Sequence, residues 1–138
     1  MLFALVGLLI LIQLIPVDRT NPPVTQEVTW NSPETRAMAQ RACFDCHSNE
    51  TTWPWYSYIA PISWRVADHV EHGRQHLNFS AWDRPNEEAE KVIEVVKEGE
   101  MPLSDYLLMH PEAKLNADEM RTLIEGLQAT LSADPPIE

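Results

Sequence analysis

The sequence has little cysteine, glycine or positive charge. Among 138 residues there are 2 cysteines, 4 glycines and 11 prolines. Two cysteines cannot build a disulfide-rich scaffold, and so few glycines disfavour the tight turns of a many-stranded sheet protein. Ten Lys and Arg stand against 21 Asp and Glu, for a formal net charge of -11, which argues against nucleic acid as a partner. The length suits one domain.

The first fifteen residues are almost entirely apolar, and Met1 to Ile12 contain no polar side chain. The length of this run lies between that of a bilayer-spanning helix, roughly 20 residues, and that of the apolar core of a signal peptide. No small-residue cleavage site follows. The sequence predicts an N-terminal membrane anchor over residues 1–16, an extended linker over residues 17–31 and a domain over residues 32–138. A buried core helix is the alternative for the apolar run.

Helix signals recur through the domain. Ser32, Pro33 and Glu34 form a helix start, and Asn116 with Glu119 has the spacing of a capping box. The predicted helices are 33–45, 61–78, 86–99 and one that begins after Asn116. With no convincing sheet, the predicted fold class is all-α. The apolar faces are narrow for a domain of this length, so something other than side chains is expected to fill its middle.

The two cysteines lie in the string Cys43-Phe44-Asp45-Cys46-His47. Two thiols one helical turn apart can reach the two vinyl groups of haem, and the next residue offers an imidazole to the iron. A redox dithiol is disfavoured because no strand pattern flanks the motif. A zinc site that adds His72 and His76 is a weaker alternative, because the stretch between the pairs is long. The sequence predicts one covalent haem c, with His47 as an axial ligand.

The sixth ligand of the iron must come from farther along the chain. Met101 is the predicted ligand, because it follows the end of the third helix and precedes Pro102 in a stiff loop. His69 and His110 are the histidine alternatives, and an open sixth position is a further one. Met109 is expected to pack in the core. A thioether raises the reduction potential relative to a second imidazole, and two strong ligands leave no room for a substrate.

Other residues are expected to support the haem or to meet a partner. An aromatic string directly after the motif predicts a pocket wall, with plain hydrophobic packing as an equal alternative. Thirteen of the 21 acidic residues lie in residues 87–138, which suits a solvated face or a docking surface for a basic redox protein. The predicted haem-pocket residues are Trp53, Trp55, Tyr56, Trp64 and Arg65, with Arg74 as a second candidate partner of the propionates. For each arginine a solvated surface position is the favoured alternative.

Several stretches of the chain resemble the bacterial haem-binding domain family. They are Cys43–Asn49, Thr52–Ser57, Ala60-Pro61, Asn78–Ser80, Trp82 and Met101–Leu103. The resemblance implies a mostly helical, cytochrome c-like periplasmic domain with a membrane segment, one c-type haem, and His47 and Met101 on the iron. The order of helix, Cys-x-x-Cys-His and Met-Pro is also similar to that of class I cytochromes c.

The expected function is that of a monohaem c-type cytochrome that carries single electrons and is not itself an enzyme. We expect it to act as a shuttle or as a subunit of a larger redox complex, with a redox protein as partner. It is predicted to sit on the periplasmic side of the bacterial inner membrane, held by a single-pass anchor over residues 1–16. The alternative is a haem sensor or peroxidase-like protein with an exchangeable sixth ligand.

Overall fold

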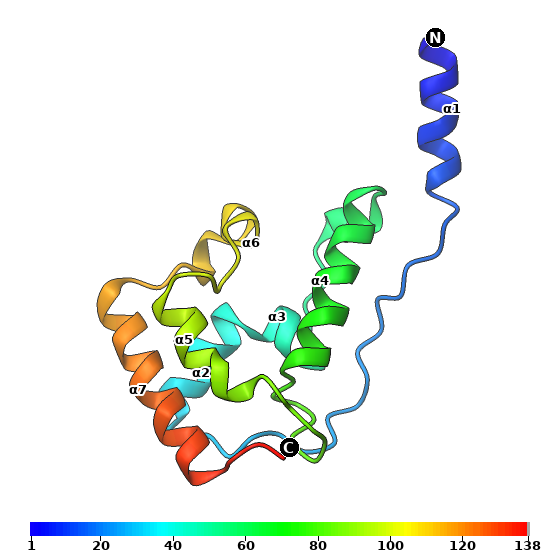
Figure 1. The fold of residues 1–138 in the computed structure, drawn as a ribbon. Helices are drawn as coiled ribbons and strands as arrows, with labels where there is room; N and C mark the ends of the chain where they lie inside the picture. The colour runs from blue at the N-terminus through cyan, green and yellow to red at the C-terminus, as the bar shows by residue number, and fades with distance from the viewer. Residues whose placement is uncertain (138) are drawn as a thin grey trace.

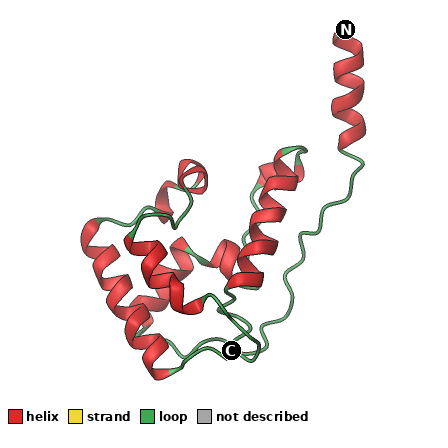
Figure 2. Ribbon diagram, in the orientation of Figure 1, coloured by secondary structure: helices red, strands yellow, loops and turns green. Residues whose placement is uncertain are grey.

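Helices and loops make up the part of the chain that the structure describes. The computed structural model describes residues 1–137, and Figures 1 and 2 show the arrangement of its elements. Within that range no strand forms, and the strand-like contacts are two isolated parallel bridges, Gln26 with Ala81 and Pro85 with Ile137. The predicted all-α character is therefore confirmed for the described residues. The elements are α1 (Leu2–Ile12), α2 (Pro33–Ala42), α3 (Phe44–His47), η1 (Trp55–Tyr58), α4 (Ile62–His76), η2 (Ala89–Lys91), α5 (Val92–Lys97), α6 (Ser104–Met109), η3 (Pro111–Ala113) and α7 (Ala117–Ala133).

The N-terminal helix α1 overturns one prediction. It has 11 residues, so it is about 16 Å long, whereas the hydrocarbon core of a bilayer is about 30 Å thick. None of the helices described in residues 1–137 combines the length and apolar character needed to cross a membrane. The predicted N-terminal membrane helix was therefore wrong, and so was the single-pass anchor on the periplasmic side of the inner membrane.

The segment between α1 and α2 runs along the domain (Figure 1). Gln13 exchanges two hydrogen bonds with the backbone of Ala60, at 2.8 and 3.1 Å. Val28 is 2% exposed, and its backbone N–H donates to the carbonyl of Phe79. The residues predicted as an extended linker are non-helical and pack against the folded part of the chain.

Helices α2 and α7 pack against each other at one small residue. A methyl group on Gly126 would overlap the Oγ1 atom of Thr35, so the absence of a side chain sets how closely the helices approach. Both helix starts agree with the sequence. The Ser32 hydroxyl accepts from the backbone N–H of Thr35, and Asn116 with Glu119 forms the predicted capping box.

Two predicted helices are divided or shortened in the structure. The first ends at Ala42, and Cys43 separates it from the short α3. The third does not begin at Asn86, because the Asn86 side chain turns inward. There it accepts from the backbone N–H of Asn78 at 2.7 Å and donates to the carbonyls of Ala81 and Arg84. Because the Asn86 side chain is buried and bonded to this loop, it does not cap a helix, and helical structure begins only after it.

Aromatic side chains form part of the core beside the two cysteines. Rings of Trp30, Phe44, Phe79 and Trp82 follow one another with centroids 5.0 to 6.4 Å apart. Phe44, which stands inside the Cys-x-x-Cys string, is 2% exposed. Helix α3, which follows Cys43 and contains Cys46, is thereby fixed to the aromatic part of the core.

Candidate functional site

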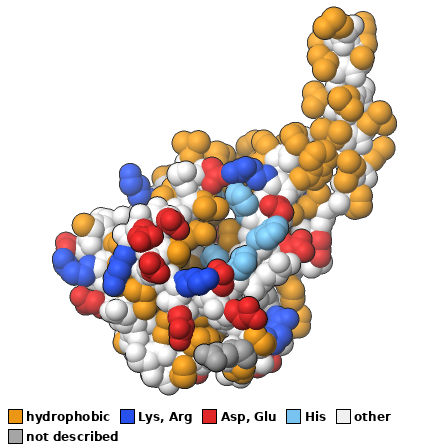
Figure 3. Space-filling model, in the orientation of Figure 1, with side chains coloured by type: hydrophobic (Ala, Val, Ile, Leu, Met, Phe, Trp, Pro, Cys, Tyr) orange, Lys and Arg blue, Asp and Glu red, His pale blue; other side chains and the backbone are white. Residues whose placement is uncertain are grey.

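A largely apolar cavity of about 250 Å³ opens between α4 and α5. Its floor comes from α3 and α7, and the loop after α5 closes one side. In Figure 3 histidine side chains gather beside an apolar hollow on this face. The cavity is lined by Ala42, Cys43, Cys46, His47, His69, His72, Gly73, His76, Leu77, Phe79, Glu88, Lys91, Val92, Val95, Val96, Met101, Pro102, Leu103, Tyr106, Leu115, Met120 and Leu123.

The His47 ring is held in one tautomer. Its Nδ1 atom lies 3.0 Å from the carbonyl oxygen of Gly73 and 3.1 Å from that of Leu77. Because carbonyl oxygens only accept, Nδ1 carries the proton, and the lone pair is on Nε2. Burial lowers the pKa of His47, which keeps the ring neutral. A neutral imidazole fixed through Nδ1 is the form that binds a metal through Nε2.

Gly73 is a site residue that the sequence analysis missed. A methyl group there would overlap the carbonyl oxygen of Cys46 and lie 3.0 Å from the Cys46 Cβ atom. Only glycine lets α4 approach α3 closely enough for its carbonyl to reach His47. The available signal was a lone glycine inside an otherwise regular helical pattern, for which a packing reason should be sought.

Cys43 and Cys46 lie on the same turn as His47. The backbone N–H groups of Cys46 and His47 both donate to the carbonyl of Cys43, at 3.2 and 2.9 Å. Withdrawal from water raises the pKa of the Cys43 thiol to about 12 and that of Cys46 to about 11, with the neighbouring charge of Asp45 as a second cause for Cys46. Both sulfurs are therefore protonated thiols at neutral pH, on the wall of the cavity that His47 also lines.

Met101 reaches the same cavity from the loop after α5. The backbone N–H groups of Glu100 and Met101 both donate to the carbonyl of Val95, at 2.9 and 3.2 Å, which fixes the loop at the end of the helix. Met101 lines the cavity together with Pro102 and Leu103. The predicted axial pair, His47 and Met101, is thus brought to one cavity, although they are 54 residues apart in the chain.

The other ligand alternatives fall into two groups. His69 lines the cavity, as do His72 and His76 one and two turns farther along α4. His110 does not, and its two ring nitrogens lie 2.7 Å from the Tyr56 hydroxyl and 3.2 Å from Glu112. Met109 is also outside the lining and is 50% exposed, so the expectation that it packs in the core was wrong.

The cavity therefore offers an imidazole, a thioether and two thiols in apolar surroundings, the donor set that holds an iron porphyrin. A family model described as a haem-binding domain matches residues 7–129. The chain belongs to the haem-binding domain family. Neither the search of curated proteins nor the search of solved structures finds a match. The matched range includes every residue that lines the cavity.

The aromatic residues predicted as the pocket wall of this haem-binding domain lie elsewhere. Trp55 is 72% exposed, and Tyr56 bonds to His110 outside the cavity. Arg65 forms an exposed ion pair of 2.6 Å with Asp105. Trp53 and Trp64 line a second cleft. The wall is aliphatic instead: Val92, Val95 and Val96 on α5 and Leu115 and Leu123 beyond it.

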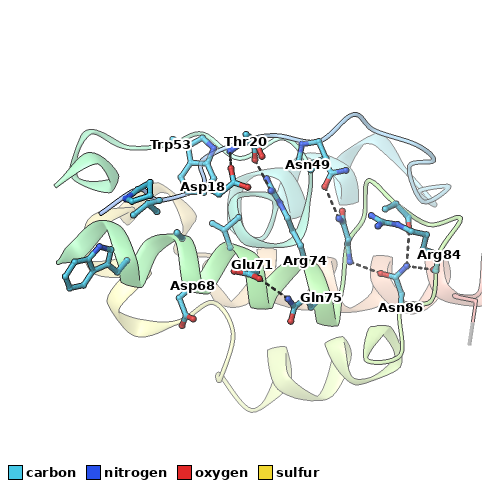
Figure 4. Close-up of a pocket in the computed structure, with 18 of the residues that line it drawn as sticks. Asp18, Thr20, Asn49, Trp53, Asp68, Glu71, Arg74, Gln75, Arg84 and Asn86 are labelled. Atoms are coloured by element: carbon cyan, nitrogen blue, oxygen red, sulfur yellow. Dashed lines mark hydrogen bonds between the residues drawn. The ribbon is translucent and has the colours of Figure 1, made fainter. Parts of the chain in front are cut away.

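The second cleft of the haem-binding domain, about 720 Å³, lies between the N-terminal segment and α4 (Figure 4). Arg74 crosses it and donates to the carbonyls of Ser48 and Thr20, the Asn21 amide oxygen and the Thr51 hydroxyl, at 2.8 to 3.0 Å. Each of its three side-chain nitrogens donates to a protein group, and Arg74 is not among the residues that line the apolar cavity. The arginine predicted near the propionates therefore joins the N-terminal segment to the loop after His47.

Proposed function

We propose that this haem-binding domain is a c-type cytochrome with one covalent haem, and that it carries single electrons without catalysing a reaction of its own. One observation carries the proposal. Cys43, Cys46, His47 and Met101 come from two distant parts of the chain and line a single apolar cavity. When bound, the haem supplies a ferric–ferrous couple that holds one electron.

Covalent attachment is supported by the state and place of the two sulfurs. Each thiol can add across one vinyl group, so that the sulfur bonds to one vinyl carbon and the thiol hydrogen goes to the other, with no oxidant needed. The described residues include no other cysteine that could compete, and neither sulfur is in a disulfide. The elevated pKa values keep both sulfurs in the protonated form that this addition consumes.

Electron carriage is supported by the axial pair. His47 is oriented by two backbone carbonyls, so its ring needs little rearrangement when the charge of the iron changes. Met101 on the opposing loop would complete the coordination and favour ferrous iron. Aliphatic side chains of α5 and α7 exclude water from the site, which also raises the potential.

A basic redox protein is the proposed partner. Helix α5 forms one wall of the cavity, and exposed carboxylates lie on it and on the residues to either side. They belong to Glu87, Glu90, Glu94, Glu98 and Glu100. Such a field speeds the encounter with a positively charged surface and weakens as salt increases. The rate of electron exchange with a basic small redox protein should therefore fall as ionic strength is raised.

Absorption spectra of the holoprotein test the proposal. Methionine ligation gives a low-spin ferric spectrum with a weak long-wavelength charge-transfer band and no reaction with CO in the ferrous state. Met101→Ala should abolish that band, lower the potential and allow CO to bind. Met109→Ala, which removes a methionine outside the cavity, should change nothing. A wild-type spectrum that is high-spin and binds CO or peroxide would instead favour the haem sensor or peroxidase-like protein.

A further inference from the structure

Helix α6 follows directly on the Met101 loop and is weakly packed. It contains no fully buried residue, and the short η3 that comes next is its main packing partner. Figure 1 shows it projecting from the rest of the domain. The start of the loop, at Glu100 and Met101, is fixed by backbone hydrogen bonds to the Val95 carbonyl. Residues 102–110 are held in place by their side chains instead.

Three side-chain hydrogen bonds or ion pairs join residues 102–110 to distant parts of the described chain. The Arg65–Asp105 pair is exposed on both sides, so it contributes little. The bond between His110 and Tyr56 acts beyond the end of α6. The third link is the Tyr106 hydroxyl, which donates to the Oδ2 atom of Asp45 at 2.8 Å.

The third link joins the two ligand-bearing parts of the site. Asp45 stands between the two cysteines, and its other carboxylate oxygen accepts from the backbone N–H of Thr52, so the acceptor is fixed on both sides. Tyr106 lines the cavity five residues after Met101. Its ring also stacks on that of His110, with centroids 4.3 Å apart. Burial, and then the charge of Asp45, raises the pKa of Tyr106, so the hydroxyl remains a donor.

We propose that the Asp45–Tyr106 hydrogen bond is a latch that holds the Met101 loop over the haem. Tyr106 is then a positioning residue for the sixth ligand. Breaking the bond frees α6 and lets Met101 leave the iron while the covalent haem and His47 stay in place. This inference rests on the proposed function, because it requires Met101 to be the ligand.

The test uses the holoprotein and exogenous imidazole, which binds ferric iron only when the methionine has left. Tyr106→Phe keeps the stacked ring and removes the donor. Its imidazole affinity should rise about tenfold over wild type, the usual effect of losing a hydrogen bond to a charged group, and the methionine band should weaken. Tyr58→Phe alters a ring that is 59% exposed and outside the cavity, and should match wild type.

Variants of Asp45 separate the latch from a general loss of stability. In Asp45→Asn the amide oxygen can accept from Thr52 while the amide N–H donates to the Tyr106 hydroxyl, so the link is kept and most of the methionine band should remain, whereas Asp45→Ala should behave like Tyr106→Phe. If Tyr106→Phe and Asp45→Ala bind imidazole as wild type does while the wild type shows the methionine band, the latch is refuted and the cytochrome stands. If the wild type lacks the band, both the ligand assignment and the latch fail.

Discussion

The Nδ1 atom of His47 lies 3.0 Å from the carbonyl oxygen of Gly73, 26 residues farther along the chain. The contact exists because α4 crosses α3 at a residue without a side chain. One glycine thus determines both how closely two helices pack and which nitrogen of the histidine keeps a free lone pair. The tautomer of His47 is therefore a consequence of helix packing.

Gly73→Ala should disturb the site and the fold together. The added methyl group overlaps the Cys46 backbone, so α4 must move, and we expect a loss of about 2 kcal/mol in the free energy of unfolding. The reduction potential should also shift, because the carbonyl acceptor of His47 moves with the helix. Chemical unfolding and redox titration of the holoprotein measure the two effects. Gly7→Ala is the control, since nothing lies within 4 Å of that position.

The contact between α2 and α7 gives a second prediction. Gly126→Ala should destabilise the protein by about 1–3 kcal/mol, because the methyl group overlaps Thr35. Thr35→Ala removes the Oγ1 and Cγ2 atoms that cause most of the overlap. The double variant should consequently lose less than the sum of the two single losses. Strict additivity in urea unfolding would show that the two residues do not determine the packing distance.

Arg74 should hold the N-terminal segment against the domain. Lysine keeps the charge but cannot reproduce the guanidinium fork that reaches Ser48, Thr20, Asn21 and Thr51. In Arg74→Lys, cleavage of the segment 18–25 by a nonspecific protease should be about tenfold faster. Arg84→Lys, an exposed arginine at the same cleft, serves as the control. Equal cleavage of the two variants would refute the role of Arg74.

The capping box of α7 predicts a pH dependence of stability. The backbone N–H of Asn116, and then Arg41, hold the pKa of Glu119 below its ordinary value of 4.5. Since the folded protein binds this proton less readily than the unfolded chain, the stabilisation is complete above about pH 4.5 and is lost as the pH falls through the lowered pKa. Glu119→Gln can still cap the helix but cannot titrate, so its stability should decline less between neutral and acid pH.

The matched control for that prediction is Glu125→Gln, an exposed carboxylate on the same helix. Its urea midpoint should fall with pH as the wild-type midpoint does. A Glu119→Gln variant whose midpoint also followed the wild-type curve would show that Glu119 does not contribute to acid unfolding.

Local signals could be read from the sequence, and contacts between distant segments could not. The starts of α2 and α7 were predictable, because a cap depends on residues three or four positions apart. The Cys-x-x-Cys-His string is local in the same sense, and the structure brings the predicted partner Met101 to the cavity that the string lines. Gly73 and Asp45 were missed, since their roles arise from partners 26 and 61 residues away.

The errors had physical causes as well. The apolar N-terminal run suggested a membrane helix, but regular helix ends at Ile12 and is too short to span. The aromatic string near the motif suggested a pocket wall, yet Trp55 is mostly exposed and valines of α5 line the cavity. Composition shows that aromatic residues are present, but the side of the chain that they face depends on tertiary packing.

The intact mass of the denatured chain tests the central claim most directly. Produced in a host that attaches haem to such motifs, the wild-type chain should have the mass of its amino acids plus one haem, and should keep it through acidified organic extraction. Chains with Cys43→Ser and Cys46→Ser together should lose the haem on extraction. A wild-type chain with the mass of its amino acids alone would contradict covalent attachment.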